Sequence, residues 1–104
     1  MDKGDALKIC LTYLKRVQLA KFDFAEAWLF GSYAKGNQHD DSDIDIAIVL
    51  NDNVNHTFET DVQLMVIRNG EETLIEPHAF SREEFNPSVP IVNQIMQYGE
   101  RIQL

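Results

Sequence analysis

The segment from Ser42 to Leu50 alternates between two kinds of side chain, and this alternation constrains the fold more than any other feature of the chain. Ile44, Ile46, Ile48 and Leu50 occupy every second position. Successive side chains of a β-strand point to opposite faces, so these four would form one uniformly aliphatic face. Such a face has to be buried against other elements, and the sequence therefore predicts a sheet covered by helices.

The opposite face of the same strand begins with two carboxylates. Asp43 and Asp45 lie two residues apart, so on a strand both would project from one face, followed by the small apolar Ala47 and Val49. This arrangement predicts the floor of a site rather than a layer of core. Carboxylate oxygens are preferred ligands of Mg²⁺, and paired carboxylates on a rigid element favour metal-assisted phosphoryl or nucleotidyl transfer.

A glycine-containing turn precedes this strand, and residues 31–36 have the sequence Gly-Ser-Tyr-Ala-Lys-Gly. Gly31 permits a tight turn and a close backbone approach to a phosphate. Ser32 adds a hydroxyl, and a short helix over 32–37 would add free backbone N–H groups. Lys35 either adds positive charge to a bound triphosphate or is a solvated surface lysine, and the sequence leaves both open.

The remaining patterns complete an alternating order of helices and strands. A helical apolar period begins at Asp5, its expected N-cap, and carries Cys10 on the buried stripe as an inert thiol. The expected elements in order are helix 5–20, strand 25–30, helix 32–37, strand 42–50, segment 58–69, strand 73–80, a helix between Ser88 as N-cap and Gly99 as C-cap, and a short strand or tail over 101–104. Segment 58–69 fits a helix at some positions and a strand at others. Pro77 would suit an edge strand.

Length and composition limit the classes of protein. With 104 residues the chain fits one domain, 1–104. It lacks a run of about 20 apolar residues and a signal-peptide pattern, and its single Cys10 excludes an internal disulfide, so we expect a cytoplasmic protein. Seventeen acidic residues against nine basic ones give a net charge of -8, which argues against direct nucleic-acid binding and suits a basic protein partner or a metal-bridged nucleotide.

The two motifs together resemble a known signature. Gly31-Ser32 with Ala34 and Gly36, followed by Ser42-Asp43-Ile44-Asp45, is similar to the motif of the DNA polymerase β-like nucleotidyltransferase superfamily. The short chain resembles its minimal nucleotidyltransferase (MNT) branch, whose members are often encoded beside a helical HEPN protein as the antitoxin of a toxin–antitoxin pair. The resemblance implies an α/β (α+β) fold with a mixed sheet and helices on one face, and it favours a helix over 58–69.

The resemblance also implies the site. Asp43 and Asp45 would be catalytic and metal-binding, and Glu76 would be the third carboxylate on the neighbouring strand, acting as metal ligand and general base where the family often has Asp. Nucleotide binding would fall to a second set: Gly31, Ser32, Lys35 and Ser42. The implied cofactor is one or two Mg²⁺ ions, with ATP as substrate. His78, two residues after Glu76, either contacts substrate or is structural.

The implied function is transfer of AMP, or another NMP, from an NTP to a hydroxyl group on a HEPN-type partner, which would silence a toxin. The alternative is a catalytically weak or inactive module that neutralises its partner by steric blocking. A small-molecule nucleotidyltransferase is less favoured, because such enzymes generally need a further domain for the acceptor. A chain this small has little length to build walls, so the carboxylate floor is expected to be an open groove that a partner protein covers.

Overall fold

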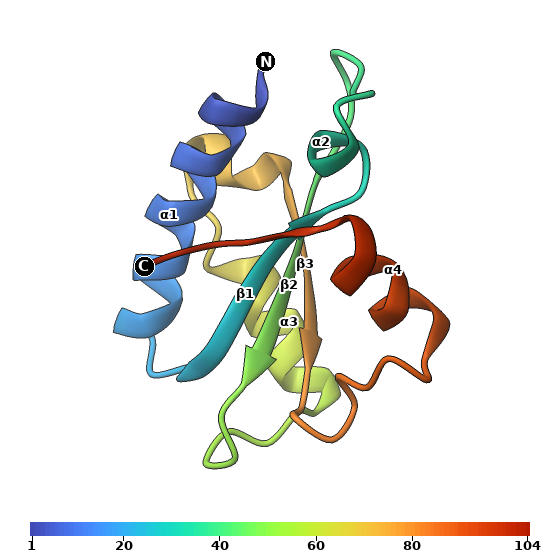
Figure 1. Cartoon of the computed structure of the whole chain (residues 1–104). Coiled ribbons are helices and arrows are strands. Elements are labelled where there is room, and N and C mark those ends of the chain that lie inside the picture. Colours follow the sequence, from blue (N-terminus) through green and yellow to red (C-terminus); the bar gives the residue numbers. More distant parts are fainter.

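The computed structural model describes residues 1–104 and contains one four-stranded sheet with helices beside it (Figure 1). The elements are α1 (Lys3–Leu19), β1 (Phe24–Phe30), α2 (Ser32–Lys35), β2 (Ile44–Leu50), α3 (Phe58–Val66), the 3-10 helix η1 (Gly70–Leu74), β3 (Ile75–Phe80), α4 (Pro90–Tyr98) and β4 (Glu100–Arg101). The strand order is β3-β2-β1-β4. β1 runs antiparallel to β2 and β4, whereas β2 and β3 are parallel, so the sheet is mixed, as predicted.

The aliphatic face of β2 forms the main core. Ile44, Ile46, Ile48 and Leu50 are all buried, and α1 and α3 cover them on one side of the sheet (Figure 1). The buried stripe of α1 consists of Ala6, Ile9, Cys10, Tyr13, Leu14 and Val17. The period predicted from the sequence is therefore confirmed. Burial raises the pKa of the Cys10 thiol to about 12, which leaves it protonated and unreactive.

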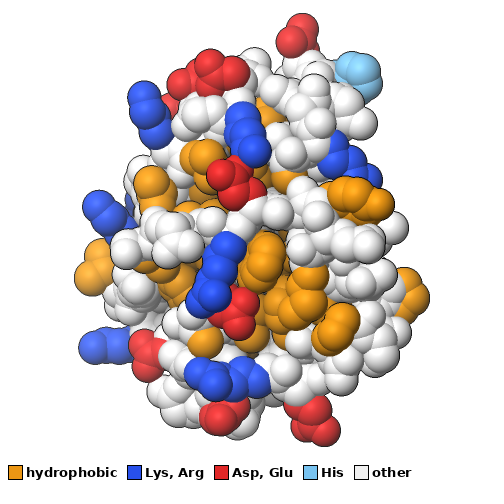
Figure 2. Space-filling view, viewed as in Figure 1, with side chains coloured by type: hydrophobic (Ala, Val, Ile, Leu, Met, Phe, Trp, Pro, Cys, Tyr) orange, Lys and Arg blue, Asp and Glu red, His pale blue; other side chains and the backbone are white.

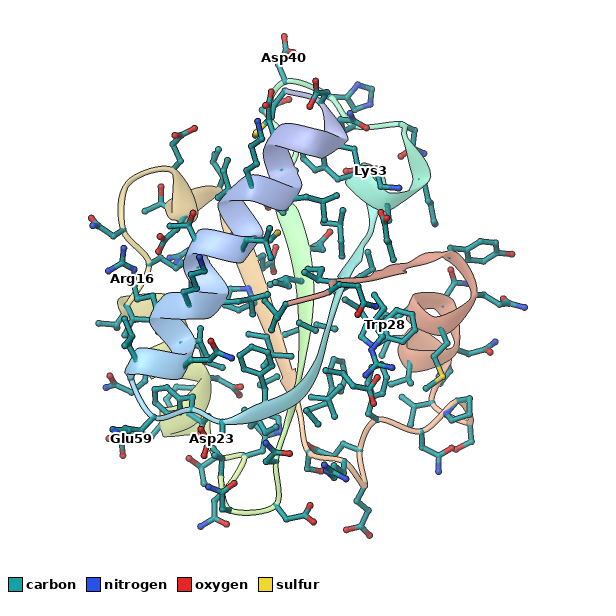
Figure 3. All side chains as sticks on the ribbon, turned by 60° about the vertical axis from the view of Figure 1, so that its left-hand side comes forward. Lys3, Arg16, Asp23, Trp28, Asp40 and Glu59 are labelled. Atoms are coloured by element: carbon teal, nitrogen blue, oxygen red, sulfur yellow. The ribbon has the colours of Figure 1, made fainter.

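The second face of the sheet is covered by α4, and here one detail of the prediction is wrong. Val92 and Ile95 of this helix pack with Ala47 and Val49 in a second, smaller core. Helices therefore lie on both faces, and the floor expected on β2 is in part a core layer. Trp28 packs its ring 6.2 Å from that of Phe85 within this second layer, and Figure 3 shows it on the α4 side of β1.

Part of this second face remains visible to solvent. Figure 2, viewed as in Figure 1 with β4 and β1 in front, shows apolar side chains in the middle of the molecule beside acidic and basic ones. Asp45, near the first end of β2, is one residue of this face that stays partly exposed, with 26% of its side chain accessible to solvent.

Two helix N-termini differ from the prediction. Asp2, not Asp5, is the N-cap of α1, and its carboxylate accepts the backbone N–H of Asp5 at 2.8 Å. Val89, not Ser88, precedes α4, and no side chain caps that helix. Pro90 begins α4 instead, where its missing N–H costs nothing.

The other segments agree more closely with the sequence. Segment 58–66 is helical, and β3, which carries Pro77, pairs with β2 only and is an edge strand. Gly99 is the C-cap of α4. β4 adds a short antiparallel pair to β1, and the N–H of Ile102 donates to the Ala27 carbonyl at 2.8 Å. None of the helices combines the length and the apolar character that spanning a bilayer requires.

A buried carboxylate ties η1 to α1. Glu72 is 3% exposed and accepts from Arg16 Nε at 2.9 Å and from the backbone N–H of Asn69 at 3.1 Å. The sequence did not indicate this pair, because the two partners lie on different elements far apart in the chain. The contact fixes the turn that leads into β3.

Candidate functional site

The register of the two parallel strands brings three candidate site side chains together. Asp45 of β2 is paired with Glu76 of β3, and Ala47 is paired with His78. Paired positions of neighbouring strands project from the same face, and so do positions two apart, so Asp45, Glu76 and His78 share one face. One ligand atom from each lies within 4.8 Å of the other two.

The three side chains differ in exposure and contact. Glu76 is exposed on the edge strand, whereas the side chains of Asp45 and His78 are 26% and 35% exposed. His78 Nε2 lies 3.3 Å from Asp45 Oδ1, within reach of a hydrogen bond whose direction depends on the imidazole tautomer. The edge of the Phe30 ring packs against the His78 ring, with 5.1 Å between centroids. The imidazole is therefore held from both sides.

Gly31 positions the turn directly against Asp45. Its φ of 72° and ψ of -152° lie in a region that is open almost only to glycine. A Cβ atom at this position would collide with the Asp45 carboxylate. The backbone of β1 therefore leaves the sheet in close contact with Asp45 and enters α2 at Ser32, and α2 ends at Gly36 in the left-handed region.

The structure brings together only part of the expected set. Asp43 lies one residue before β2, is exposed, and stands outside the group formed by Asp45, Glu76 and His78. The ladder pairing of β2 begins at Ile44, so Asp43 lies just before the first paired residue of the strand. The metal-binding and catalytic roles of Asp43 stay a prediction, as do those of Asp45 and Glu76.

The expected nucleotide-binding residues lie on either side of this group. Gly31 and Ser32 are half-buried, and Gly31 lies directly against Asp45. The Ser42 hydroxyl accepts the backbone N–H of His39 at 2.8 Å and closes a turn. Lys35 is exposed, and its ammonium lies 5.6 Å from the centroid of the Tyr98 ring. Their roles in nucleotide binding stay predictions.

A pocket that the sequence did not reveal adjoins the same turn. It has a volume of about 290 Å³ and is lined by Phe30, Gly31 and Lys35 on one side and by Ile91, Gln94 and Tyr98 of α4 on the other. The two sides are far apart in the chain, so no local pattern indicated them. The spacing of residues 91, 94 and 98 places them on one stripe of the helix, and this spacing is the one feature of the sequence that could have indicated the α4 side of the pocket.

A second histidine–carboxylate group lies beyond the other ends of β2 and β3. His56 contacts Glu84 through Nδ1 and Asp61 through Nε2 at 2.8 Å. Burial lowers the pKa of His56, but the bonds to Glu84 and Asp61 raise it by more, so it is raised overall. The pKa of Glu84 is lowered by its bonds to the Ser81 backbone and to His56. His56 and Glu84 lie in loops and Asp61 lies on α3, so the cluster ties two loops to this helix and stands apart from the site.

Comparisons with known proteins agree with this geometry. The family model described as "Polymerase beta, Nucleotidyltransferase" matches residues 13–102. Comparison with curated proteins gives no significant match. A crystal structure of a candidate nucleotidyltransferase from Sulfolobus solfataricus is similar with a TM-score of 0.63 and 22% identity, over 79% of this chain and 72% of that one.

A second solved structure is similar over nearly the whole chain. It is a chain of a mutant of the toxin–antitoxin MntA-HpeT, similar with a TM-score of 0.63 and 16% identity, over 99% of this chain and 73% of that one. At these identities both structures establish the fold, and the match of the family model establishes the family.

Proposed function

The chain belongs to the polymerase β nucleotidyltransferase family, and from this premise we propose that it transfers AMP from ATP to a hydroxyl group on a protein partner. The observation that carries the proposal is the pairing of Asp45 with Glu76 across parallel strands, directly beside the Gly31 backbone. Two carboxylates on rigid strands next to an open glycine turn suit a site where phosphates meet a metal ion.

The donor set fits one divalent cation. Asp45 and Glu76 offer carboxylate oxygens and His78 offers an imidazole nitrogen, and the three ligand atoms lie within 4.8 Å of one another. Carboxylates suit Mg²⁺ and Mn²⁺, whereas imidazole suits transition metals, so Mn²⁺ matches the set at least as well as Mg²⁺. When bound, such an ion supplies charge neutralisation at the phosphoryl oxygens.

The chain's own residues would then bind and orient the reactants. The Gly31 backbone and the Ser32 hydroxyl would face the phosphates, and Lys35 would add positive charge nearby. Asp45 is held in place by the Gly31 backbone and by His78. Glu76 is exposed on the edge strand, where an incoming hydroxyl group would arrive, and it would accept the proton of that hydroxyl.

We extend the proposal to the partner. The fold is similar to a chain of the toxin–antitoxin MntA-HpeT, and the net charge of -8 suits a basic protein surface. The acceptor would be a hydroxyl group on a helical HEPN-type toxin, and the modification would silence that toxin in the cytoplasm, where ATP is available. This chain would be the antitoxin.

The test is transfer of label from ATP to the protein encoded next to this one, with Mg²⁺ or Mn²⁺ present. Asp45→Asn and Glu76→Gln should each lower the rate by orders of magnitude, because each removes a charged oxygen from the group. Glu83→Gln is the matched control, since Glu83 is also an exposed acid but lies outside the site. Transfer by Asp45→Asn at the wild-type rate would contradict the proposal.

A second candidate is a binding module that blocks its partner without chemistry. The position of Asp43 outside the group favours it, because the expected three-carboxylate set is then incomplete. The two candidates differ in one observable, the mass of the partner after co-expression. An unmodified partner that is nonetheless neutralised would support the binding module, whereas one or more added AMP groups would support the transferase.

A further inference from the structure

The pocket between α2 and α4 has no occupant in the fold itself. Ile91 and Tyr98 line it and are 46% and 55% exposed, whereas Val92 and Ile95 on the neighbouring stripe of the same helix are fully buried. The helix thus uses one stripe for the core and presents a second, partly apolar stripe to the pocket. Half-exposed aliphatic and aromatic side chains around a concave site are typical of a ligand pocket.

The pocket shares two walls with the carboxylate group. Gly31 lines it and is also the backbone that packs against Asp45. Phe30 lines it as well, is paired with Asp45 in the sheet, and packs its ring against His78. Only the thickness of one residue therefore separates the pocket from the site, so one molecule could occupy both.

The chemistry of the lining selects the kind of group that fits. The chain has a net charge of -8, yet no acidic residue lines the pocket, and Lys35 is its one charged residue. Tyr98 offers its aromatic ring, with the Lys35 ammonium over one face at 5.6 Å from the centroid, and Gln94 offers both a donor and an acceptor. A flat, uncharged group with polar edges, joined to an anion, matches this lining.

We propose that this pocket holds the nucleobase of the nucleoside triphosphate, stacked on the ring of Tyr98, with the triphosphate extending past Gly31 towards Asp45. This rests on the proposed function. The volume of about 290 Å³ is close to the lower limit for ligand sites, which suits one base rather than a whole nucleotide. Stacking on an aromatic ring tolerates every base, and the Gln94 amide would favour one base edge over another.

The experiment compares two ligands that share phosphates but not a base. A non-hydrolysable ATP analogue and inorganic tripolyphosphate are each titrated with Mn²⁺ into the wild type and Tyr98→Ala, and binding is measured by calorimetry. Loss of one stacking ring should weaken the analogue about 10-fold and leave tripolyphosphate unchanged. Tyr98→Phe, which keeps the ring, should bind the analogue as the wild type does.

A matched control separates this effect from general loss of an exposed aromatic. Phe58 on α3 is 83% exposed and lies outside the pocket, so Phe58→Ala should bind both ligands normally. Equal weakening of both ligands by Tyr98→Ala, or no weakening of either, would overturn the proposal. Unchanged nucleotide affinity with lost partner binding would assign the pocket to the partner protein instead. If the wild type binds neither ligand, the proposed function itself fails.

Discussion

Gly31→Ala should damage both the fold and the site, and for two separable reasons. The φ of 72° and ψ of -152° at this position are strained for any residue with a Cβ atom. The new methyl group would also collide with the Asp45 carboxylate, which would have to move. Gly36→Ala is the matched control, because Gly36 also has a positive φ of 78° but nothing lies within 4 Å of a Cβ there.

The expected magnitudes follow from these differences. Alanine at position 36 requires only a left-handed conformation, which should lower the free energy of unfolding by about 1–2 kcal/mol. Alanine at position 31 requires a rarer backbone conformation and a displaced Asp45 rotamer, which together should lower the free energy of unfolding by about 2–4 kcal/mol. For a domain of this size each kcal/mol lowers the melting temperature by about 4 °C. Moving a catalytic carboxylate by about 1 Å can cost on the order of 100-fold in rate.

The assay has two readouts. Urea unfolding followed by circular dichroism gives the free energy of unfolding of both variants, and a Mn²⁺ titration reports on the Asp45 group. Gly31→Ala should lose more stability than Gly36→Ala and should also lose most of its Mn²⁺ affinity, which Gly36→Ala keeps. The reasoning is refuted if the two variants are equally stable and both bind Mn²⁺ as the wild type does.

Three further outcomes are expected. Glu72→Ala removes a buried carboxylate and should lower the free energy of unfolding by about 1.5–3 kcal/mol. Its neighbour Glu71 is exposed, so Glu71→Ala should change the free energy of unfolding by less than about 0.5 kcal/mol. Equal effects of the two substitutions in urea unfolding would contradict this. His56→Gln should lower the free energy of unfolding more at pH 6 than at pH 9. The raised pKa of His56 gives a stabilisation that is fully present below about pH 6.5 and is lost as the pH rises through the pKa of the folded state, while the lowered pKa of Glu84 keeps its carboxylate charged at both pH values. Equal losses of stability at the two pH values would be evidence against this. Cys10 should resist alkylation by iodoacetamide at pH 8 in the native state and react in urea, as mass spectrometry would detect; rapid native labelling would show that the thiol is accessible.

Local patterns were sufficient for the elements whose burial has a clear period. The alternation from Ile44 to Leu50 and the helical stripe around Cys10 predicted their buried faces, because the period alone decides which side chains share a face. Helix ends were less predictable. Asp2 and Asp5 are both acceptable caps, and only the observed hydrogen bond decides between them.

Features that depend on distant pairing could not be predicted in the same way. The stripe of α4 predicted a helix but not which face of the sheet Val92 and Ile95 would cover. The contact of His78 with Asp45 depends on the register between β2 and β3, which the sequence of either strand leaves open. The position of Asp43, just before β2 and outside the group of Asp45, Glu76 and His78, could not be predicted from the alternation alone.

The pairing of Asp45 with Glu76 also bears on an edge strand of the sheet, β3. β3 pairs on one side only, with β2, so this edge strand should open more readily than β2, which pairs on both sides. A cation held by both carboxylates would fasten the outer strand to the centre of the sheet and would slow hydrogen exchange in β3 by an amount that grows with its concentration. The rigidity of this edge would then depend on the ionic composition of the cell as well as on the packing of the chain.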